Sequence, residues 1–566
     1  MGMGTPSGPS PIFLGKLLWP GEVTVTLRWI GHRVKNGWKF RVTAYGPFKH
    51  EYYSQDAYFV TASLISIAFF LWYASRLRRT AILLPPGPPG LPVLGNLLSV
   101  HQFTHRGLAK LSKIHGGFFH LRVGQANVFV VSSPETVREI IHENDSVFSH
   151  RPVTAAMVYV SYDLADMAFA HYGPFWRQMR KLCVLKLFSP RRDVSWRVVR
   201  GEVDALVRSV AELRRVAGSV GDLVFKFATN VTFRAAFGAQ SREDEKVFVD
   251  IILELSEIFM AFNMGDYIPC LGWLDLNGIG KRMAAARHAL DVFIDRIIDE
   301  HLAKLRNGDV SASDMVDDMI AYLVDAPGGP HKRADGVELG DLHLTRDNIK
   351  GLIMARNDIM FGGTKTVAST VEWALSELLR NPDELKRAQD ELAGVVGLRR
   401  RVNQDDLDNL PHLRCVTKEV LRLHPPLPLL LRESLHDCAI GGYTVPRGSR
   451  IWINNWAMCR DEALWGTDAA AFRPSRFADE SARVEFKGGD FQYLPFGSGR
   501  RSCPGMQLGM FTVELGLAEL LHCFDWSLPA GTEPLELDMD DVFGLTAPKA
   551  ERLCAVPSPR LSCPLL

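Results

Sequence analysis

One segment of the chain, residues 57–75, is predominantly apolar and contains no charged side chain. It is bounded by Asp56 and Arg76. A helix of this length would span roughly 28 Å, close to the ~30 Å hydrocarbon thickness of a bilayer. A buried core helix is the alternative, but such helices usually keep a polar face, which this segment lacks. The pattern therefore predicts a transmembrane anchor over residues 56–76.

The residues after the predicted anchor are first basic and then rich in proline. Arg76, Arg78 and Arg79 place the remainder of the chain in the cytosol by the positive-inside rule. Residues 77–96 contain the stretch Leu-Pro-Pro-Gly-Pro-Pro-Gly-Leu-Pro, which is unsuited to a helix or a central strand. A stiff hinge is therefore expected between the anchor and the body.

Residues 1–55 form an N-terminal extension of unusual composition. They carry seven Lys or Arg residues but only two acids, Glu22 and Glu51. The scarcity of acids is typical of organelle-targeting peptides, although the segment is not rich in serine or arginine. An incorrectly predicted first exon is the alternative interpretation.

Downstream of the hinge, the polar and apolar positions follow mainly a helical period. Residues 291–305 and 383–395 mix apolar and charged side chains at three- and four-residue spacing. Short β-rich runs occur at residues 118–131 and 443–456. The pattern predicts a mainly α-helical body with small β-sheets, forming one large domain over residues 97–566.

Composition and charge exclude several classes of protein. The 566-residue chain has 65 Lys and Arg against 64 Asp and Glu, so its net charge of +1 offers no basic surface for nucleic acid. Its nine cysteines include no C-x-x-C pair and are scattered, which argues against a disulfide framework or a structural zinc site. One cysteine nevertheless lies in a distinctive setting.

That setting is the stretch Phe-Gly-Ser-Gly-Arg-Arg-Ser-Cys-Pro-Gly, with the pattern F-x-x-G-x-R-x-C-x-G formed by Phe496, Gly499, Arg501, Cys503 and Gly505. A chance match in a chain of this length has a probability on the order of a few in ten thousand. Glycine turns present the cysteine without obstruction, and backbone N–H groups with a nearby arginine would favour the thiolate. A thiolate is a suitable axial ligand for haem iron. A buried structural cysteine is the alternative.

The loop resembles the haem-thiolate signature of the cytochrome P450 monooxygenases, and the resemblance extends from about Leu84 to the C-terminus. It implies the cytochrome P450 fold and a haem b whose iron is bound by Cys503. Glu419-Val-Leu-Arg422 resembles the E-x-x-R helix of the family, and a segment ending in Arg476 and Phe477 follows in the expected order. The resemblance implies a buried charge cluster of Glu419, Arg422 and Arg476. Surface ion pairs are the alternative.

Three further residues resemble the family's haem-propionate partners. Trp176 and Arg180 match a W-x-x-x-R helix, and positions i and i+4 share a helix face. The indole N–H and the guanidinium could therefore reach one propionate. Arg432 resembles a third partner. An ordinary amphipathic surface helix is the alternative for Arg180.

A long helical pattern over residues 345–381 contains Phe361-Gly362-Gly363-Thr364-Lys365-Thr366, which resembles the oxygen-activation motif. The resemblance implies catalytic roles for Gly362, Gly363, Lys365 and Thr366: the glycines leave space for O₂, and the threonine guides protons. The family has an acid where this chain has Lys365, and lysine carries no acceptor. About three extra residues just upstream would rotate the helix by roughly 300° unless a bulge absorbs them. We therefore expect release of hydrogen peroxide in place of product.

Local similarity at residues 161–176, 407–413, 496–508 and 537–549 resembles plant ferulate/coniferaldehyde 5-hydroxylases. It implies NADPH- and O₂-dependent hydroxylation at ring position 5 of guaiacyl phenylpropanoids such as coniferaldehyde, coniferyl alcohol or ferulate, in syringyl lignin biosynthesis. A catalytically impaired haem-binding paralogue is the alternative, because of Lys365 and the apparent insertion. A haem-thiolate isomerase that needs neither O₂ nor a reductase is a further alternative.

The resemblance also implies partners, a location and substrate contacts. NADPH–cytochrome P450 reductase would dock on the side that carries Cys503, where Arg177, Lys181 and Arg500 are basic, unless these form an ordinary solvated face. The chain would be a single-pass protein of the endoplasmic reticulum membrane with its body in the cytosol. Substrate contacts are expected from the loop 155–162 and, with core packing as the alternative, from Phe361, Leu430, Val542 and Phe543.

Overall fold

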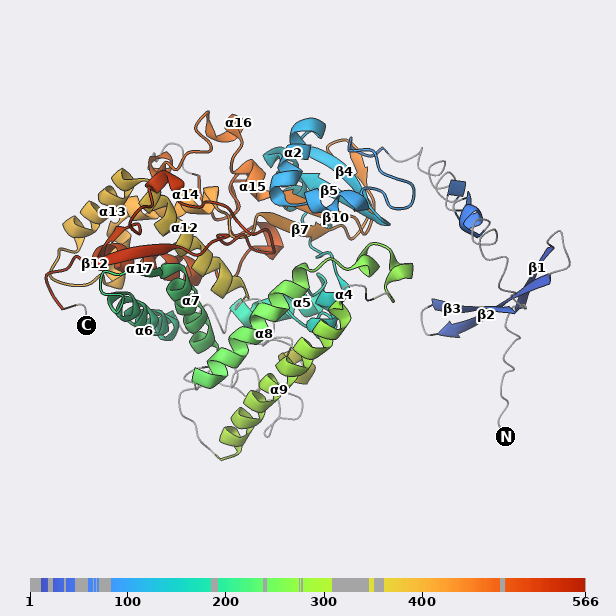
Figure 1. Cartoon of the computed structure of the whole chain (residues 1–566), viewed down its shortest axis with the longest axis horizontal. Helices are drawn as coiled ribbons and strands as arrows, with labels where there is room; N and C mark the ends of the chain where they lie inside the picture. Colours follow the sequence, from blue (N-terminus) through green and yellow to red (C-terminus); the bar gives the residue numbers. More distant parts are fainter. Residues whose placement is uncertain are drawn as a thin grey trace. The chain divides into compact units, whose positions relative to one another are not determined.

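The computed structural model divides the chain into two units, Met1–Arg79 and Thr80–Leu566. The residues it describes are 12–18, 24–34, 37–45, 60–64, 66–67, 69–70, 83–184, 192–237, 242–273, 275, 278–307, 346–350, 361–478 and 484–564 (Figure 1). None of the helices within these ranges has both the length and the hydropathy that crossing a bilayer requires.

The first unit contains a three-stranded antiparallel sheet in the order β1-β2-β3, formed by Ile12–Leu18, Thr24–Val34 and Gly37–Tyr45. Of the predicted anchor, residues 60–64, 66–67 and 69–70 are helical, and its remaining residues lie outside the described ranges. The predicted extension over residues 1–55 therefore carries strands, which its acid-poor composition did not indicate.

The second unit is mainly helical, as predicted. Its helices are α2 (His105–His115), α3 (Pro134–Arg138), α4 (Ala155–Val160), α5 (Pro174–Cys183), α6 (Arg192–Ala211), α7 (Val220–Phe237), α8 (Arg242–Met260), α9 (Ile279–Arg306), α12 (Thr366–Arg380), α13 (Pro382–Val395), α14 (Pro411–Leu423), α15 (Asn455–Met458), α16 (Glu462–Trp465) and α17 (Met506–Cys523).

The strands of this unit form small sheets, again as predicted. The largest has the order β4-β5-β10-β7, with β10 parallel to β5 and antiparallel to β7. Its strands are β4 (Phe118–Val123), β5 (Ala126–Val131), β7 (Leu429–Glu433) and β10 (Arg450–Asn454). The others pair β11 (Phe524–Ser527) with β12 (Cys554–Pro559) and β6 (Gly218–Ser219), and β8 (Cys438–Ile440) with β9 (Tyr443–Val445).

Helix α12 lies in the middle of the largest hydrophobic cluster, packed against α7, α14 and α17 (Figure 1). Because neighbours surround it, almost every α12 side chain is buried, including the carboxylates of Glu372 and Glu377. Each of these has a cationic or imidazole partner, Arg552 for Glu372 and His424 for Glu377, at 2.8 and 2.7 Å. Such pairing makes burial of the carboxylates tolerable and fixes the helix that carries the oxygen motif.

The long helical pattern predicted over residues 345–381 is helical at residues 346–350 and 361–380, while residues 351–360 lie outside the description. Phe361–Lys365 form a π-helical turn at the motif itself, which accommodates one extra residue. The apparent three-residue insertion upstream lies outside the described residues. Pro382 begins α13, directly after the end of the pattern predicted over residues 345–381. Asn381 does not cap α13 with its side chain, because its amide donates backwards to the Glu377 carbonyl oxygen at 2.7 Å.

Candidate haem-thiolate site

The loop before α17 holds Cys503 in a fixed backbone setting. The Cys503 N–H donates to the Phe496 carbonyl oxygen at 2.9 Å, and Gly505 is the N-cap residue of α17. Gly499 has a φ of +68°, and a Cβ there would lie 2.7 Å from the Asp145 carboxylate. Glycine is therefore required at this turn both for its conformation and for its lack of a side chain.

Cys503 is exposed, so a ligand can reach its sulfur. Burial by the surrounding protein nevertheless raises the pKa of the thiol, while the Gly505 N–H and Arg180 act to lower it. The pKa of the Cys503 thiol is thus raised overall, which contradicts the expectation that the loop by itself favours the thiolate. Arg501 is not among the groups that lower the pKa of Cys503, and its guanidinium donates to backbone carbonyl oxygens. A metal cation bound to the sulfur would supply the missing stabilisation.

Arg501 makes a dense set of hydrogen bonds to segments far away in the chain. Its guanidinium donates to the carbonyl oxygens of Ser149, Met167, Ala168 and Ala170, the first at 2.8 Å. Burial, followed by the like charges of Arg151 and Arg432, lowers the pKa of Arg501 to about 8. The loop of Cys503 is thereby locked to residues 149–170.

Arg432, on β7, is 3% exposed, and Asp145 is the one opposite charge that acts on it among the described residues. One Nη donates to the Ser498 carbonyl oxygen at 2.7 Å, whereas the other Nη is buried without a hydrogen-bond partner. Burial, then Arg151, lowers its pKa to about 9. Orphaned buried donors and clustered guanidinium groups suit an anionic ligand. The residues around Cys503 thus fit haem, whose propionates are anionic and whose iron accepts a thiolate.

Trp176 differs in one respect from the prediction. Its indole N–H donates to the Met167 carbonyl oxygen at 2.9 Å, so it is not available to a propionate. The ring instead lies between two guanidinium groups, with the Cζ atoms of Arg501 and Arg180 at 4.5 and 5.5 Å from its centroid. Arg180 donates to the carbonyl oxygen of Ser502, next to Cys503, at 2.7 Å. Helix α5 thus contacts the thiolate loop directly.

The structure brings the three charged residues of the E-x-x-R region together in the core. Glu419 and Arg422 are both fully buried and joined by two hydrogen bonds of 2.7 Å. Arg476 Nε lies 3.5 Å from the same carboxylate. Arg422 also donates to the carbonyl oxygens of Cys459 and Ala469 at 2.6 and 2.7 Å. The cluster ties α14 to the segment that leads to the Cys503 loop.

The oxygen motif occupies the π-helical turn and the first residue of α12. The Thr366 hydroxyl donates to the Gly362 carbonyl oxygen, four residues earlier. Of the two glycines, Gly362 faces open space, but a Cβ on Gly363 would lie 3.1 Å from the Thr232 hydroxyl on α7. The structure therefore assigns helix packing to Gly363, whereas sequence reasoning gave both glycines to O₂.

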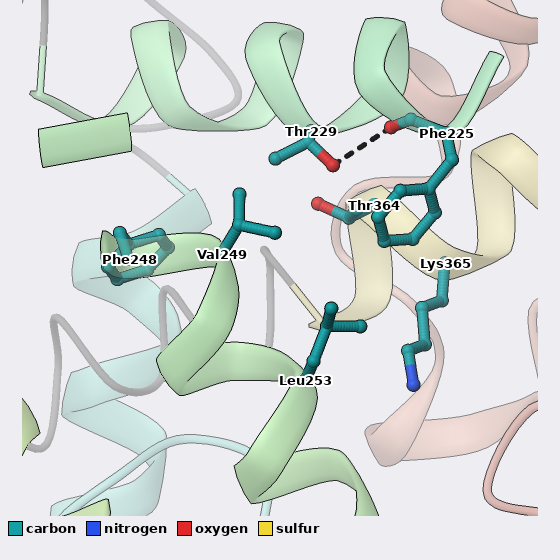
Figure 2. Close-up of a pocket in the computed structure, with 7 residues that line it drawn as sticks. All are labelled: Phe225, Thr229, Phe248, Val249, Leu253, Thr364 and Lys365. Atoms are coloured by element: carbon teal, nitrogen blue, oxygen red, sulfur yellow. Dashed lines mark hydrogen bonds between the residues drawn. The ribbon is translucent and has the colours of Figure 1, made fainter. Parts of the chain in front are cut away.

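The Lys365 side chain extends from the π-helical turn away from α7, on the side of Leu253 of α8, as Figure 2 shows. Together with Thr364 it lines a small crevice that is otherwise formed by Phe225, Thr229, Phe248, Val249 and Leu253. Burial in these surroundings lowers the pKa of the Lys365 amine, and Glu257 opposes that shift. The ammonium thus replaces the family's acid in a largely apolar setting.

The residues predicted to contact substrate lie in different surroundings. Leu430 is 9% exposed and packs in the core with Phe129 and Ile451, which does not support a role in substrate binding. Val542 is 54% exposed, and the neighbouring Phe543 ring lies 5.6 Å from that of His105. The side chain of Phe361 lies outside the described residues.

Two charged residues of this site were missed from the sequence. Arg151 donates to the Leu431 carbonyl oxygen at 2.7 Å and belongs to the guanidinium cluster. Asp166 is buried, accepts hydrogen bonds from the Phe169 and Ala170 N–H groups, and has its pKa raised to about 7 by burial. For Asp166, the sequence signal was an acidic residue within the largely uncharged stretch before Trp176.

The basic residues proposed for partner binding lie on α5 and on the Cys503 loop. Arg177 and Lys181 are exposed. Arg500 is also exposed but forms an ion pair with Asp145 at 2.9 Å. The charge of Arg500 is therefore already compensated by a carboxylate.

Known proteins resemble the chain over most of its length. Residues 85–554 match the family model described as Cytochrome P450. Cytochrome P450 84A1 and Cytochrome P450 84A4, both of Arabidopsis thaliana, are 52% identical over 508 residues and 48% identical over 516 residues. Each alignment covers 89% of this chain, and 96% and 98% of the relatives.

A flavonoid 3'-monooxygenase, CYP75B137 of Crocosmia x crocosmiiflora, is 39% identical over 89% of this chain and 98% of its own length. A zebra fish cytochrome P450 solved with progesterone superposes with a TM-score of 0.67, over 81% of this chain and 99% of that one, at 24% identity. The match to the zebra fish structure shows that the two proteins share a fold. The family match, the two relatives at about half identity and the exposed cysteine among guanidinium groups lead to one conclusion: the chain belongs to the cytochrome P450 family of monooxygenases.

Proposed function

We propose that the protein hydroxylates ring position 5 of guaiacyl phenylpropanoids, namely coniferaldehyde, coniferyl alcohol or ferulate, in syringyl lignin biosynthesis. The observation that carries the monooxygenase part is the exposed Cys503 in a loop where Arg180 bonds to Ser502 and Arg432 to Ser498, which fits a haem thiolate. The substrate class rests on the local resemblance of residues 161–176, 496–508 and 537–549 to 5-hydroxylases.

In this proposal haem b supplies O₂ activation and accepts the electrons. Cys503 would hold the haem iron through its sulfur, and Arg432 and Arg180 would bind the haem propionates. Thr366, whose hydroxyl donates to the Gly362 carbonyl oxygen, would hold a proton at its Oγ1 for transfer during the reaction. Lys365 cannot accept such a proton while it is charged, because an ammonium group has only donors.

The electrons come from NADPH through NADPH–cytochrome P450 reductase. The basic residues Arg177, Lys181 and Arg500 on the side of Cys503 form the proposed docking surface, since exposed positive charge steers an acidic partner. Residues 56–76 would anchor the protein in the endoplasmic reticulum membrane, with residues 77–96 as a hinge and residues 97–566 in the cytosol.

A second candidate function is a haem-binding paralogue with impaired catalysis. Lys365 supports it, because the side chain lies in an apolar crevice where the family has a proton-relaying acid. In that case the haem-thiolate spectrum would be normal, but NADPH would be consumed largely for hydrogen peroxide.

Microsomal expression with the reductase tests both candidates. The proposal expects a carbon monoxide difference spectrum typical of a haem thiolate, together with NADPH-dependent 5-hydroxylation of coniferaldehyde. A thiolate spectrum without any product would favour the impaired paralogue. Absence of the thiolate spectrum from well-folded protein would refute both.

A further inference from the structure

The loop after α4 has an unusual backbone. Tyr162, Asp163 and Leu164 have φ values of +55°, +58° and +63°. They form the only run of three non-glycine residues with positive φ in the part of the chain that the structure describes. Left-handed conformations cost roughly 1–2 kcal/mol for each such residue. Surrounding contacts must therefore hold the loop in place.

The Tyr162 side chain supplies such contacts. It is 6% exposed, and its hydroxyl donates to the Asp291 carboxylate on α9 at 2.7 Å. The Arg287 guanidinium, one helical turn earlier on α9, lies 3.6 Å from the centroid of the Tyr162 ring. Burial and then the bond to Asp291 raise the pKa of Tyr162, so the phenol remains a donor.

Asp291 connects this loop to a third segment. Lys350 donates to Asp291 at 3.0 Å and to Asp295 at 2.6 Å, and it belongs to the helical residues 346–350 that precede the oxygen motif. Burial alone would raise the pKa of Asp291, but the bonds from Tyr162 and Lys350 outweigh it and lower the pKa. The carboxylate therefore stays ionised and accepts from both donors at once.

Two backbone contacts strengthen the same attachment. Arg287 donates to the Tyr159 carbonyl oxygen. The Ala155 N–H donates to Asp266, between α8 and α9, at 2.8 Å. Residues 155–164 are thus attached at several points to α9 and its neighbourhood, and Tyr162 is the point at which a side chain bridges to the residues before α12.

We propose that Tyr162 is a positioning residue, which holds residues 155–164 against α9 and residues 346–350 and thereby sets how fast substrate enters and leaves. The inference rests on the proposed function, in which this loop contacts the phenylpropanoid. No existing contact would be lost from the haem site if Tyr162 were replaced by phenylalanine, because the hydroxyl bonds only to Asp291 among the hydrogen bonds described.

The test compares Tyr162→Phe with a matched control in full-length protein with haem. Tyr162→Phe keeps the ring beside Arg287 and removes the bond to Asp291. Tyr443→Phe is the control, because Tyr443 lies on β9, outside residues 155–164, and its ring packs against that of Phe118, at 6.2 Å. Stopped-flow binding of coniferaldehyde, followed by the substrate-induced spin-state change of the haem, gives the association and dissociation rates.

We expect Tyr162→Phe to raise the dissociation rate and KM roughly three- to tenfold, the net effect of losing one typical intramolecular hydrogen bond. The value of kcat should stay within about twofold, and limited proteolysis within residues 155–164 should accelerate. Tyr443→Phe should change none of these. A purely structural role would instead lower kcat together with the amount of haem-thiolate protein.

Unchanged rates and unchanged proteolysis in Tyr162→Phe would overturn the inference. If Tyr162→Phe fails to fold, Asp291→Asn replaces it and must show the same rise in KM and dissociation rate. If the unsubstituted protein gives a thiolate spectrum but does not bind coniferaldehyde, the proposed substrate class fails. Proteolysis of the loop then decides the positioning role alone: faster cleavage in Tyr162→Phe supports it, and equal cleavage refutes it.

Discussion

The carboxylate of Glu419 and the guanidinium of Arg422 form two hydrogen bonds of 2.7 Å while neither residue is exposed to solvent. Removal of one partner would leave a buried charge unpaired, which typically costs about 3–5 kcal/mol. We predict that Glu419→Gln lowers the thermal unfolding midpoint and sharply reduces the haem retained per polypeptide.

The control for this change is Glu485→Gln. Glu485 pairs with Lys418 at 3.0 Å but is 35% exposed on its side chain, so the loss should be about 1 kcal/mol or less. Equal haem retention in the two variants would contradict the view that the buried pair supports the Cys503 loop.

The exposed Cys503 gives the most direct spectroscopic prediction. Cys503→Ala should abolish the thiolate band in the carbon monoxide difference spectrum, because no other described cysteine lies on this loop. Cys554→Ser, at another exposed cysteine, should leave the band unchanged. A normal band in Cys503→Ala would exclude the assigned axial ligand.

Lys365 determines a prediction about coupling. Lys365→Glu restores a group that can accept and pass on a proton, so the product formed per NADPH should rise several-fold and hydrogen peroxide should fall. Thr366→Ala, in the presence of Lys365→Glu, should cancel much of this gain. Equal product per NADPH in Lys365→Glu and the unsubstituted protein would remove the argument for impaired catalysis.

Glu514 on α17 leads to a prediction about pH. Burial raises the pKa of its carboxyl from 4.5 to about 7. The folded state therefore holds a proton that the unfolded state has lost between these pH values, and this residue makes stability fall as the pH rises through that window. Glu514→Gln should have little effect near pH 4.5 but should stabilise the protein by up to roughly 2–3 kcal/mol above pH 7.

The measurement is the thermal midpoint of Glu514→Gln relative to the unsubstituted protein from pH 5 to 8. Glu212→Gln, at an exposed position on the surface, serves as the reference for a carboxylate without burial. A stabilisation that is independent of pH would show that the effect of Glu514→Gln is not due to ionisation.

The exposed cations on α5 allow a test of the reductase surface. Arg177→Glu should raise the reductase concentration needed for half-maximal turnover several-fold at low ionic strength, and salt should reduce the difference. Lys246→Glu, an exposed position on α8, should have little effect. Equal effects of the two charge reversals would argue against a docking surface on α5.

The sequence by itself determined the features that depend on local spacing. The Cys503 loop, the E-x-x-R pair and the start of α13 at Pro382 are encoded within about ten residues, and each could be recognised without the fold. The mainly helical character and the small sheets followed from periodicity for the same reason, since each element buries one face that repeats along the chain.

Only the tertiary structure decided which partners these residues meet. The Trp176 indole N–H is bound to Met167, Gly363 packs on Thr232 of α7, and Leu430 belongs to the core. Arg501 donates to carbonyls more than 330 positions earlier in the chain, and it is not among the groups that lower the pKa of the Cys503 thiol. Hydrogen bonds and packing contacts of this kind join segments that are distant in sequence, and no local pattern specifies which of the available partners will be close enough to satisfy a buried group.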